Sequence, residues 1–328
     1  MLKIVFMGTP DIAKTSLEKI YNAGNEILAV VTTPDTQKGR GMKLSISPVK
    51  EYAIEKEFKI YQPEKIRKNH EFIEDIKKLN PDIICVVAYG KILPKSLLDI
   101  PKFGCINLHP SLLPKYRGPA PIQWAILNGD DTTGVSIMYL DEGMDTGDII
   151  LQVETKIDSK ETTGELWDRL SKIGSDLLVS ALKEIENGTA KRIKQEGDIK
   201  IAPMIEKEMS KINWEEKTGK EICNLVRGLN PIMGAYSYLD GKKFKFWDVE
   251  YLENSDVVNS FPELNEYIYK LKDISSGTVL FSDSKNGLFI KVNDGVIKAI
   301  EIQPENSKKM KTCDYLRGNN IEIGKIFE

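Results

Sequence analysis

The sequence predicts an α/β domain built around a mostly parallel sheet, followed by a second domain made of short strands. In the first half of the chain, short apolar runs alternate with stretches of helical periodicity, which is typical of βαβ units. In the last third, short apolar runs are separated by turn residues, which is typical of a small closed barrel. A chain of 328 residues is long enough for about two such domains.

The alternation in the first half defines the expected elements of the α/β domain. Thr162 is expected to cap the last helix, with Glu165 three residues later completing a capping box. Gly8-Thr9-Pro10, after the first strand, does not begin a dinucleotide fingerprint, because the next glycine is Gly24. The expected strands are residues 2–7, 26–33, 82–88, 103–108, 135–139 and 149–157, and the expected helices are residues 11–23, 48–56, 69–79 and 162–186.

The second domain follows an aperiodic, mixed-charge stretch at residues 188–213 that is typical of a linker. A helix is expected at residues 218–229, and turn signals at Asp240-Gly241 and Asn293-Asp294-Gly295 indicate hairpins. A barrel of this size is of the OB type, which often binds oligonucleotides, and a purely structural barrel fits the pattern equally well. The expected strands are residues 235–239, 243–251, 277–282, 288–293 and 296–303.

Composition limits the classes of function. The formal net charge is −3 at pH 7, and acidic residues slightly outnumber basic ones in both halves of the chain. A nucleic-acid contact must therefore come from local basic patches. The four cysteines have neither metal-ligand nor disulfide spacing, and Cys85 and Cys105 are expected in the core. No apolar run approaches the roughly 20 residues that span a bilayer and no signal segment precedes the first strand, so we expect a soluble, cytoplasmic protein.

The most informative motif lies at the end of the strand expected at residues 103–108. Asn107 and His109 are two residues apart, so strand alternation places both side chains on one face, at the carboxyl edge where open α/β sheets bind ligands. Pro110 and Pro114 prevent the strand from continuing. With the carboxylate of Asp145, these groups suit acyl transfer to an amine, because an amide can hold the oxyanion, an imidazole can move protons and a carboxylate can orient the imidazole.

An Asn-x-His pair by itself is explained as well by a buried histidine that hydrogen-bonds to a neighbour. Two observations favour a site. The chain has only two histidines, and the other, His70, lies in a charged stretch that is typical of a solvated helix face. The segment at residues 111–123 is rich in proline, glycine and basic residues although it lies between two apolar strands, which indicates a shaped loop rather than a plain connection.

These motifs together resemble a known family. The segment Asn107-Leu-His109-Pro-Ser-Leu-Leu-Pro114, with Asp145 downstream, is similar to the formyltransferases that use 10-formyltetrahydrofolate. The longer strings SLLPKYRGPAPIQWAI, FMGTP and LDEGMDTGDI resemble the methionyl-tRNA formyltransferases in particular. The resemblance extends over essentially the whole chain, through Ile212-Asn-Trp214 and Arg227-Gly-Leu-Asn-Pro231. One departure is Tyr116, where the family often has tryptophan.

The resemblance implies formyl transfer to the α-amine of methionine on initiator tRNA, with Asn107, His109 and Asp145 as the catalytic residues and no metal. Asn107 would donate its amide to the oxyanion. His109 would either donate to the oxyanion as imidazolium or carry the proton from the amine to the folate nitrogen, and Asp145 would orient the ring. The implied pocket for 10-formyltetrahydrofolate comprises Tyr89, Gly90, Ser111, Leu112, Leu113, Pro114 and Asp141.

The resemblance also implies how the chain divides and where tRNA binds. A Rossmann-like formyltransferase domain would occupy residues 1–189, a linker residues 190–212, and an OB-like tRNA-binding domain residues 213–328, in an expected monomer. The basic, glycine-rich loop at residues 34–47 would wedge into the tRNA acceptor end, although its composition alone fits a disordered surface loop. The candidate tRNA contacts, each of which also fits a solvated face, are Lys38, Arg40, Lys43, Lys242, Lys243 and Lys245.

Other functions share parts of this pattern. A nucleotide-sugar or glycinamide-ribonucleotide formyltransferase would share Asn107, His109 and Asp145 but would have no use for the basic loop. A formyltetrahydrofolate hydrolase would keep the same three residues and use water as the acceptor. A catalytically inactive RNA-binding module would leave these three residues, at matched positions, unexplained.

Overall fold

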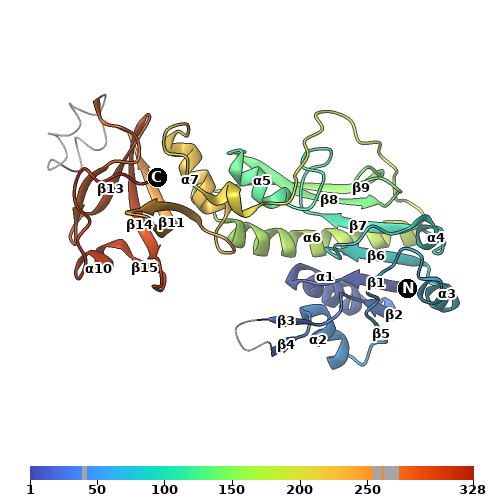
Figure 1. Ribbon diagram of the computed structural model, residues 1–328. Coiled ribbons are helices and arrows are strands. Elements are labelled where there is room, and N and C mark those ends of the chain that lie inside the picture. The colour runs from blue at the N-terminus through green and yellow to red at the C-terminus, as the bar shows by residue number, and fades with distance from the viewer. Residues whose placement is uncertain (39–42, 254–260, 262–272) are drawn as a thin grey trace. The chain divides into compact units, whose positions relative to one another are not determined.

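The computed structural model describes residues 1–38, 43–253, 261 and 273–328, which divide into two units. The first unit comprises Met1–Ile122, Thr132–Lys156 and Leu166–Met204. The second comprises Gln123–Asp131, Ile157–Glu165 and Ile205–Glu328, apart from the gaps just given. Each unit has its own sheet, as the two sequence patterns predict (Figure 1). Within the described ranges, no helix is long and apolar enough to cross a membrane.

The first unit contains a mostly parallel sheet in the order β5-β2-β1-β6-β7-β8-β9. The strands from β5 to β7 are parallel, and β8 and β9 are antiparallel at one edge. The order reverses beside β1, because the chain leaves β1 toward β2 and later returns on its other side as β6; ligands of open α/β sheets bind at such reversals. The strands are β1 (Lys3–Gly8), β2 (Glu26–Val31), β5 (Ile60–Tyr61), β6 (Ile83–Val87), β7 (Cys105–His109), β8 (Thr132–Tyr139) and β9 (Ile149–Lys156).

Helices pack on both faces of this sheet. On one face, Ile76 of α3 and Leu97 of α4 lie in one apolar cluster with Val86 of β6. On the other face α6 passes close to β7, since a Cβ added at Gly174 would lie 2.9 Å from the Leu108 side chain. The helices are α1 (Asp11–Asn22), α2 (Pro48–Glu55), α3 (His70–Leu79), α4 (Lys95–Leu98), α5 (Pro121–Leu127) and α6 (Thr163–Glu186).

Every strand and helix expected in the α/β domain is found, with ends that differ by a few residues. The capping box predicted at Thr162 is confirmed, because its backbone N–H and its hydroxyl both donate to the Glu165 carboxylate at 2.8 Å. These hydrogen bonds lower the pKa of Glu165. Short elements were missed because they span too few residues to show a period. They are the hairpin of β3 (Thr36–Lys38) and β4 (Lys43–Ser45), together with β5, α4 and α5.

The second unit is an antiparallel barrel in the order β10-β11-β14-β13-β12, with β15 paired to β14. The last residues of the chain close it: Glu328 exchanges two backbone hydrogen bonds with Tyr238 of β10, and the Phe327 N–H donates to Gly277 beside β12. The predicted small closed barrel is therefore confirmed. The elements are η1 (Lys207–Ser210), α7 (Gly219–Gly228), β10 (Ala235–Leu239), β11 (Lys242–Leu252), β12 (Val279–Asp283), β13 (Gly287–Val292), β14 (Gly295–Pro304), β15 (Met310–Lys311) and α10 (Thr312–Leu316).

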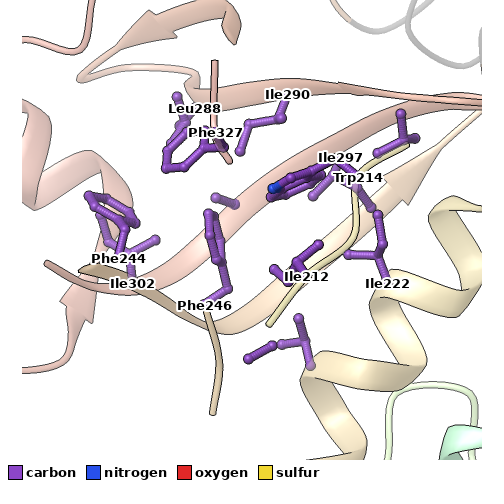
Figure 2. Packing of buried hydrophobic residues seen from close by; sticks show 14 of the residues in the cluster. Ile212, Trp214, Ile222, Phe244, Phe246, Leu288, Ile290, Ile297, Ile302 and Phe327 are labelled. Atoms are coloured by element: carbon purple, nitrogen blue, oxygen red, sulfur yellow. The ribbon is translucent and has the colours of Figure 1, made fainter. Parts of the chain in front are cut away.

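Aromatic side chains fill the interior of this barrel (Figure 2). The ring of Phe246 lies 5.6 Å from Trp214 and 5.4 Å from Phe327, both in edge-to-face contact, centroid to centroid. Trp214 also donates its indole N–H to the Ser237 hydroxyl at 2.9 Å, so its polar edge is satisfied inside the core. The surrounding aliphatic side chains are Ile212, Ile222, Leu288, Ile290, Ile297 and Ile302.

Candidate active site

Asn107 and His109 lie at the carboxyl end of β7, on the sheet face opposite α6. Leu108 between them packs toward α6, and strand alternation turns its two neighbours to the other face. Because β7 is hydrogen-bonded to β6 on one side and β8 on the other, the sheet interior fixes both positions. The His109 side chain is buried, whereas the half-buried Asn107 amide has no hydrogen-bond partner among the described residues. Free amide donors therefore stand about 7 Å along the strand from an imidazole.

Both ring nitrogens of His109 have a defined neighbour. Nε2 is 2.8 Å from the backbone carbonyl oxygen of Tyr116. A carbonyl oxygen can only accept, so Nε2 carries a proton whenever this hydrogen bond is formed. Nδ1 faces the Asp145 carboxylate, with 3.7 Å between Nδ1 and Oδ2. Proton exchange at this ring is therefore confined to Nδ1, and a carboxylate stands where a positive charge would develop.

Asp145 belongs to the loop between β8 and β9. Its φ of 55° is a left-handed conformation that costs an L-residue about 1 kcal/mol, so the surrounding contacts must hold it there. Its Oδ2 atom accepts a hydrogen bond from the Gly118 N–H at 2.8 Å, and this is the oxygen that faces Nδ1 of His109. The structure thus brings together the three residues that the sequence predicts as catalytic.

The loop that supplies the Tyr116 carbonyl is anchored to the sheet by Ser136. This buried hydroxyl, in β8, donates to the Ser111 carbonyl at 2.6 Å and accepts from the Leu113 N–H at 3.1 Å. Gln152 of β9 donates to the same hydroxyl and to the Leu113 carbonyl. Ser111 in turn donates to the Lys115 carbonyl. The Ser111 hydroxyl and the peptide groups of Leu113 therefore hold the loop, while the Leu113 side chain packs with Met138 and Ile149. The folate contacts predicted at Ser111 and Leu113 stay a prediction.

The other residues predicted for the folate pocket present mainly backbone. The Tyr89 side chain is buried, and burial raises the pKa of its phenol to about 12. Tyr89 lies between Ala88 at φ 45° and Gly90 at φ 80°, so the chain turns sharply after β6, at the reversal of the sheet. Asp141 accepts from the Gly143 N–H and the Thr146 hydroxyl at 2.9 and 2.6 Å, which closes its own loop. Of the others, Leu112 is half-buried and Pro114 is buried.

Residues 190–204, whose composition is that of a linker, are hydrogen-bonded to the first unit. Ile193 exchanges two backbone hydrogen bonds with Ile149 of β9, at 2.8 and 2.9 Å, and the Ala202 N–H donates to the Arg117 carbonyl at 2.7 Å. Between these anchors, the Gln195 side chain contacts both site loops. Sequence reasoning missed Gln195 because the pairing of this segment is made by backbone groups, which leave no periodic pattern.

The lysines predicted to contact RNA through β11 differ in their surroundings. Phe244 and Phe246 point into the core, so alternation places Lys243 and Lys245 on the outer face. The Lys243 ammonium lies 3.5 Å from the Tyr236 ring centroid, and the Lys245 ammonium lies 5.3 Å from that of Trp247. Burial, and then Lys243, lowers the pKa of Lys245. Lys242, at the hairpin end, is exposed.

The remaining predicted RNA contacts lie in the β3–β4 hairpin. Lys38 and Lys43 are backbone partners at the ends of the two strands, within the segment predicted from the sequence as a loop. Arg40 lies outside the described residues.

Surface clefts of about 460 and 400 Å³ lie among the described residues of the second unit. The smaller is lined by Cys223 and Arg227 among others, and burial raises the pKa of the Cys223 thiol to about 11. A thiol that stays protonated at neutral pH is a poor nucleophile. The larger is lined by Trp214, Phe327 and neighbours.

Comparison with known proteins shows the family of the chain. Residues 2–182 match the formyl transferase family, and residues 204–320 match the formyl transferase C-terminal domain. The methionyl-tRNA formyltransferase of Clostridioides difficile (strain 630) is 47% identical over 326 residues, covering 99% of each chain. That of Caldanaerobacter subterraneus subsp. tengcongensis is 44% identical over 328 residues, covering 100% of each chain.

Solved structures share the fold at low sequence identity. WlaRD, a sugar 3N-formyl transferase, superposes with a TM-score of 0.65 at 23% identity, covering 94% of this chain and 99% of that one. HypX from Aquifex aeolicus in complex with tetrahydrofolic acid gives a TM-score of 0.60 at 16% identity, covering 100% of this chain and 51% of that one. These likenesses extend the fold assignment over both units.

Gly147→Ala should destabilise the Asp145 loop. A Cβ at Gly147 would lie 1.8 Å from the Tyr139 carbonyl oxygen, so the backbone must shift, and overpacking of this kind costs about 1–3 kcal/mol. Thermal unfolding and amide hydrogen exchange of residues 140–148 measure the effect. Gly318→Ala is the control, because nothing lies within 4 Å of its added Cβ. An unchanged melting temperature and unchanged exchange in Gly147→Ala would contradict the close approach.

Proposed function

Because this chain belongs to the methionyl-tRNA formyltransferase family, we propose that it transfers the formyl group of 10-formyltetrahydrofolate to the amine of methionine on initiator tRNA. The observation that carries the proposal is the arrangement of Asn107, His109 and Asp145 at the carboxyl end of β7. It would act in the cytoplasm as a monomer, on the reaction that prepares the tRNA for translation initiation.

The free donors of Asn107 supply the oxyanion site. The neutral amine attacks the formyl carbon, a C–N bond forms, and the formyl oxygen takes up negative charge. The Asn107 N–H groups, which have no partner among the described residues, are available to stabilise that charge. The intermediate then collapses, breaking the bond to the folate nitrogen, and tetrahydrofolate leaves with a proton on that nitrogen.

His109 moves the proton between these two nitrogens. Its Nε2 atom is occupied by the Tyr116 carbonyl, so Nδ1 takes the proton from the attacking amine and gives it to the leaving nitrogen. The Asp145 carboxylate, 3.7 Å from Nδ1, stabilises the imidazolium that exists between these two steps. This geometry favours the proton-shuttle role over a fixed oxyanion donor at His109.

Backbone groups at the carboxyl edge of the sheet would bind the folate. The sharp turn at Ala88–Gly90 and the loop carrying Asp141 would present peptide groups. The loop at Ser111–Pro114 would form a fixed side of the pocket, because Ser136 and Gln152 already occupy its Ser111 carbonyl and both Leu113 peptide groups. Peptide N–H and C=O groups held at fixed positions suit a heterocycle that carries several donors and acceptors.

A lysine–aromatic strip on the barrel would bind the tRNA. We define this strip as Tyr236, Tyr238, Lys243, Lys245 and Trp247, on β10 and β11. Cations over aromatic rings suit both parts of a nucleotide, since lysines attract phosphates and rings stack on unpaired bases. Neither lysine of the strip forms an ion pair with a described residue. The Lys245 ammonium is partly buried and donates to the Met233 carbonyl at 2.7 Å, so Lys243 carries the more available charge. In the first unit, Lys38, Arg40 and Lys43 would contact the acceptor end.

A formylation assay tests the function. Purified protein is incubated with 10-formyltetrahydrofolate and methionyl-initiator tRNA, and formyl-methionine is measured after release from the tRNA. Formation that requires both the protein and the formylated folate is the expected result. Parallel reactions with an amino-sugar nucleotide and with water alone as acceptor identify the two alternative activities. Formyl transfer to the sugar, or hydrolysis alone, would overturn the proposal.

His109→Ala, Asn107→Ala and Asp145→Ala should each lower kcat by at least about 100-fold, because each removes a group that acts chiefly in the transition state. Folate affinity should change little. The melting temperature should change little in Asn107→Ala but fall in His109→Ala and Asp145→Ala, which leave the Tyr116 carbonyl and the Gly118 N–H without their partners. His70→Ala is the matched control, since His70 is exposed at the start of α3. Turnover near that of the wild type in purified His109→Ala would exclude the mechanism.

Lys243→Gln should weaken tRNA binding by about 3- to 10-fold and reduce the slope of log Kd against log salt by about 1. Lys242→Gln removes the same charge from the exposed hairpin end, outside the strip, and should have a smaller effect. Binding is measured by titration at several salt concentrations. Equal effects of the two substitutions would show that only overall charge matters and that the strip is not the contact.

A further inference from the structure

The Gln195 side chain uses all of its hydrogen-bonding groups at the active site. Its Nε2 atom donates to the Asp145 carbonyl at 2.9 Å and to the Gly147 carbonyl at 2.8 Å. Its Oε1 atom accepts from Nε and Nη2 of Arg117 at 3.0 and 2.7 Å. One amide therefore joins the loop that carries Asp145 to the segment that follows Tyr116.

The chemistry of these contacts requires an amide. Two carbonyl oxygens on one side need two donors, and a guanidinium on the other needs an acceptor, which only asparagine and glutamine side chains combine. A glutamate in place of Gln195 would keep the acceptor for Arg117 but would set carboxylate oxygens against two carbonyls. The conformation at Asp145 makes the contact more important, because its left-handed φ of 55° must be held by its neighbours.

The two ends of this clamp hold the groups that define His109. Arg117 lies between Tyr116, whose carbonyl accepts from Nε2, and Gly118, whose N–H donates to the Asp145 carboxylate. Displacement of either end would change the separation between Nδ1 and Asp145 Oδ2, now 3.7 Å. Gln195 thus acts on the imidazole through both of its neighbours, although it contacts neither ring nor substrate.

The clamp is itself fixed in place. Lys194 forms an ion pair with Asp148 at 2.8 Å, and the Arg192 guanidinium lies 3.7 Å from the Tyr139 ring centroid. Ile193, between them, is paired with Ile149 of β9. These contacts hold the residues before Gln195 against the ends of the loop that carries Asp145, so the position of the Gln195 amide is fixed.

We propose that Gln195 is a positioning residue for formyl transfer, holding Asp145 and the Tyr116–Gly118 segment in the arrangement that lets His109 exchange its proton at Nδ1. The proposal rests on the proposed function for its rate effect. It assigns a catalytic consequence to a segment that otherwise connects the two units of the chain.

The rate test uses Gln195→Ala, Gln195→Glu and a matched control. Both Gln195 variants should lower kcat at least about 10-fold, while KM for folate and for tRNA stays within about 3-fold. Asn25→Ala is the control, because Asn25 is also a partly buried amide that bridges backbone groups, at the amino edge of the same sheet. It should lower stability without lowering kcat. A full rate in Gln195→Glu would overturn the proposal, since that variant lacks both donors.

A double-mutant cycle shows whether Gln195 acts through Asp145. In an Asp145→Asn background, Gln195→Ala should lower kcat by less than about 2-fold, because the group that it positions has already been altered. A loss as large as in the wild-type background would overturn the proposal. Stability is measured for all four proteins, and a kcat loss that merely follows the melting temperature across this set would also overturn it.

A substrate-free measurement separates this proposal from the proposed function. The chain has only two histidines, so ¹⁵N signals of their rings can be assigned with a single His70→Ala spectrum. Gln195→Ala should shift the Nδ1 signal of His109, and Asn25→Ala should not. Unchanged His109 signals in Gln195→Ala would overturn the positioning role whatever the protein formylates. If the shift is present but methionyl-tRNA is not formylated, the proposed function fails and the positioning of His109 stands.

Discussion

The hydrogen bond between His109 Nε2 and the Tyr116 carbonyl is the constraint on which the site depends. It fixes which nitrogen carries the permanent proton and leaves Nδ1 as the only position for exchange. It also demands that a carbonyl from a loop seven residues later arrive at the end of β7 with hydrogen-bond geometry. Three sets of hydrogen bonds hold the loop in this position. Ser136 anchors it to β8, its backbone pairs with residues 200–202, and the Gly118 N–H donates to Asp145. Tyr116, at which the family often has tryptophan, contacts the imidazole through its backbone, so the exchange of one aromatic for another leaves the contact unchanged.

A buried imidazole beside a partly buried carboxylate is favourable only when both keep their hydrogen bonds, because an unpaired polar group in such a place costs about 1–3 kcal/mol. Strand β7 holds His109 in a fixed position, and the loops that carry Tyr116 and Asp145 supply the neighbours of its ring nitrogens. Asp145 has a left-handed backbone conformation, and Gly147 lies so close to Tyr139 that no side chain would fit. The loop therefore adopts an unfavourable backbone conformation that places the Asp145 carboxylate beside His109. Gln195 completes the arrangement by satisfying two carbonyls of this loop from a segment about 50 residues further along the chain.

The parts of the fold that were predictable are the elements whose apolar residues recur with the period of a strand or a helix. The strands and long helices of both units follow from alternating apolar runs, and Thr162–Glu165 follows from capping chemistry. Asn107 and His109 were predictable as a pair because they share a strand face, and Asp145 followed from the motif that accompanies them. The short hairpin of β3 and β4 and the attachment of residues 190–204 were not predictable, because backbone pairing over two or three residues leaves no mark on composition. The folate contacts predicted at Ser111 and Leu113 stay a prediction. The anchoring of their loop by the Ser111 hydroxyl and the Leu113 N–H was not predictable, because these hydrogen bonds depend on how the loop packs against β8.

The charge distribution explains why chemistry and binding are assigned to different units. With a net charge of −3, the chain as a whole does not attract a polyanion, so affinity for tRNA must come from a few placed cations. The second unit contains neither histidine, and burial raises the pKa of its cleft cysteine, Cys223, to about 11. In the first unit, the buried His109 has the Tyr116 carbonyl and the Asp145 carboxylate beside its two ring nitrogens. An acceptor whose amine is attached to a large nucleic acid suits this division, because recognition far from the amine can supply binding energy while the groups around His109 act only on the atoms that change.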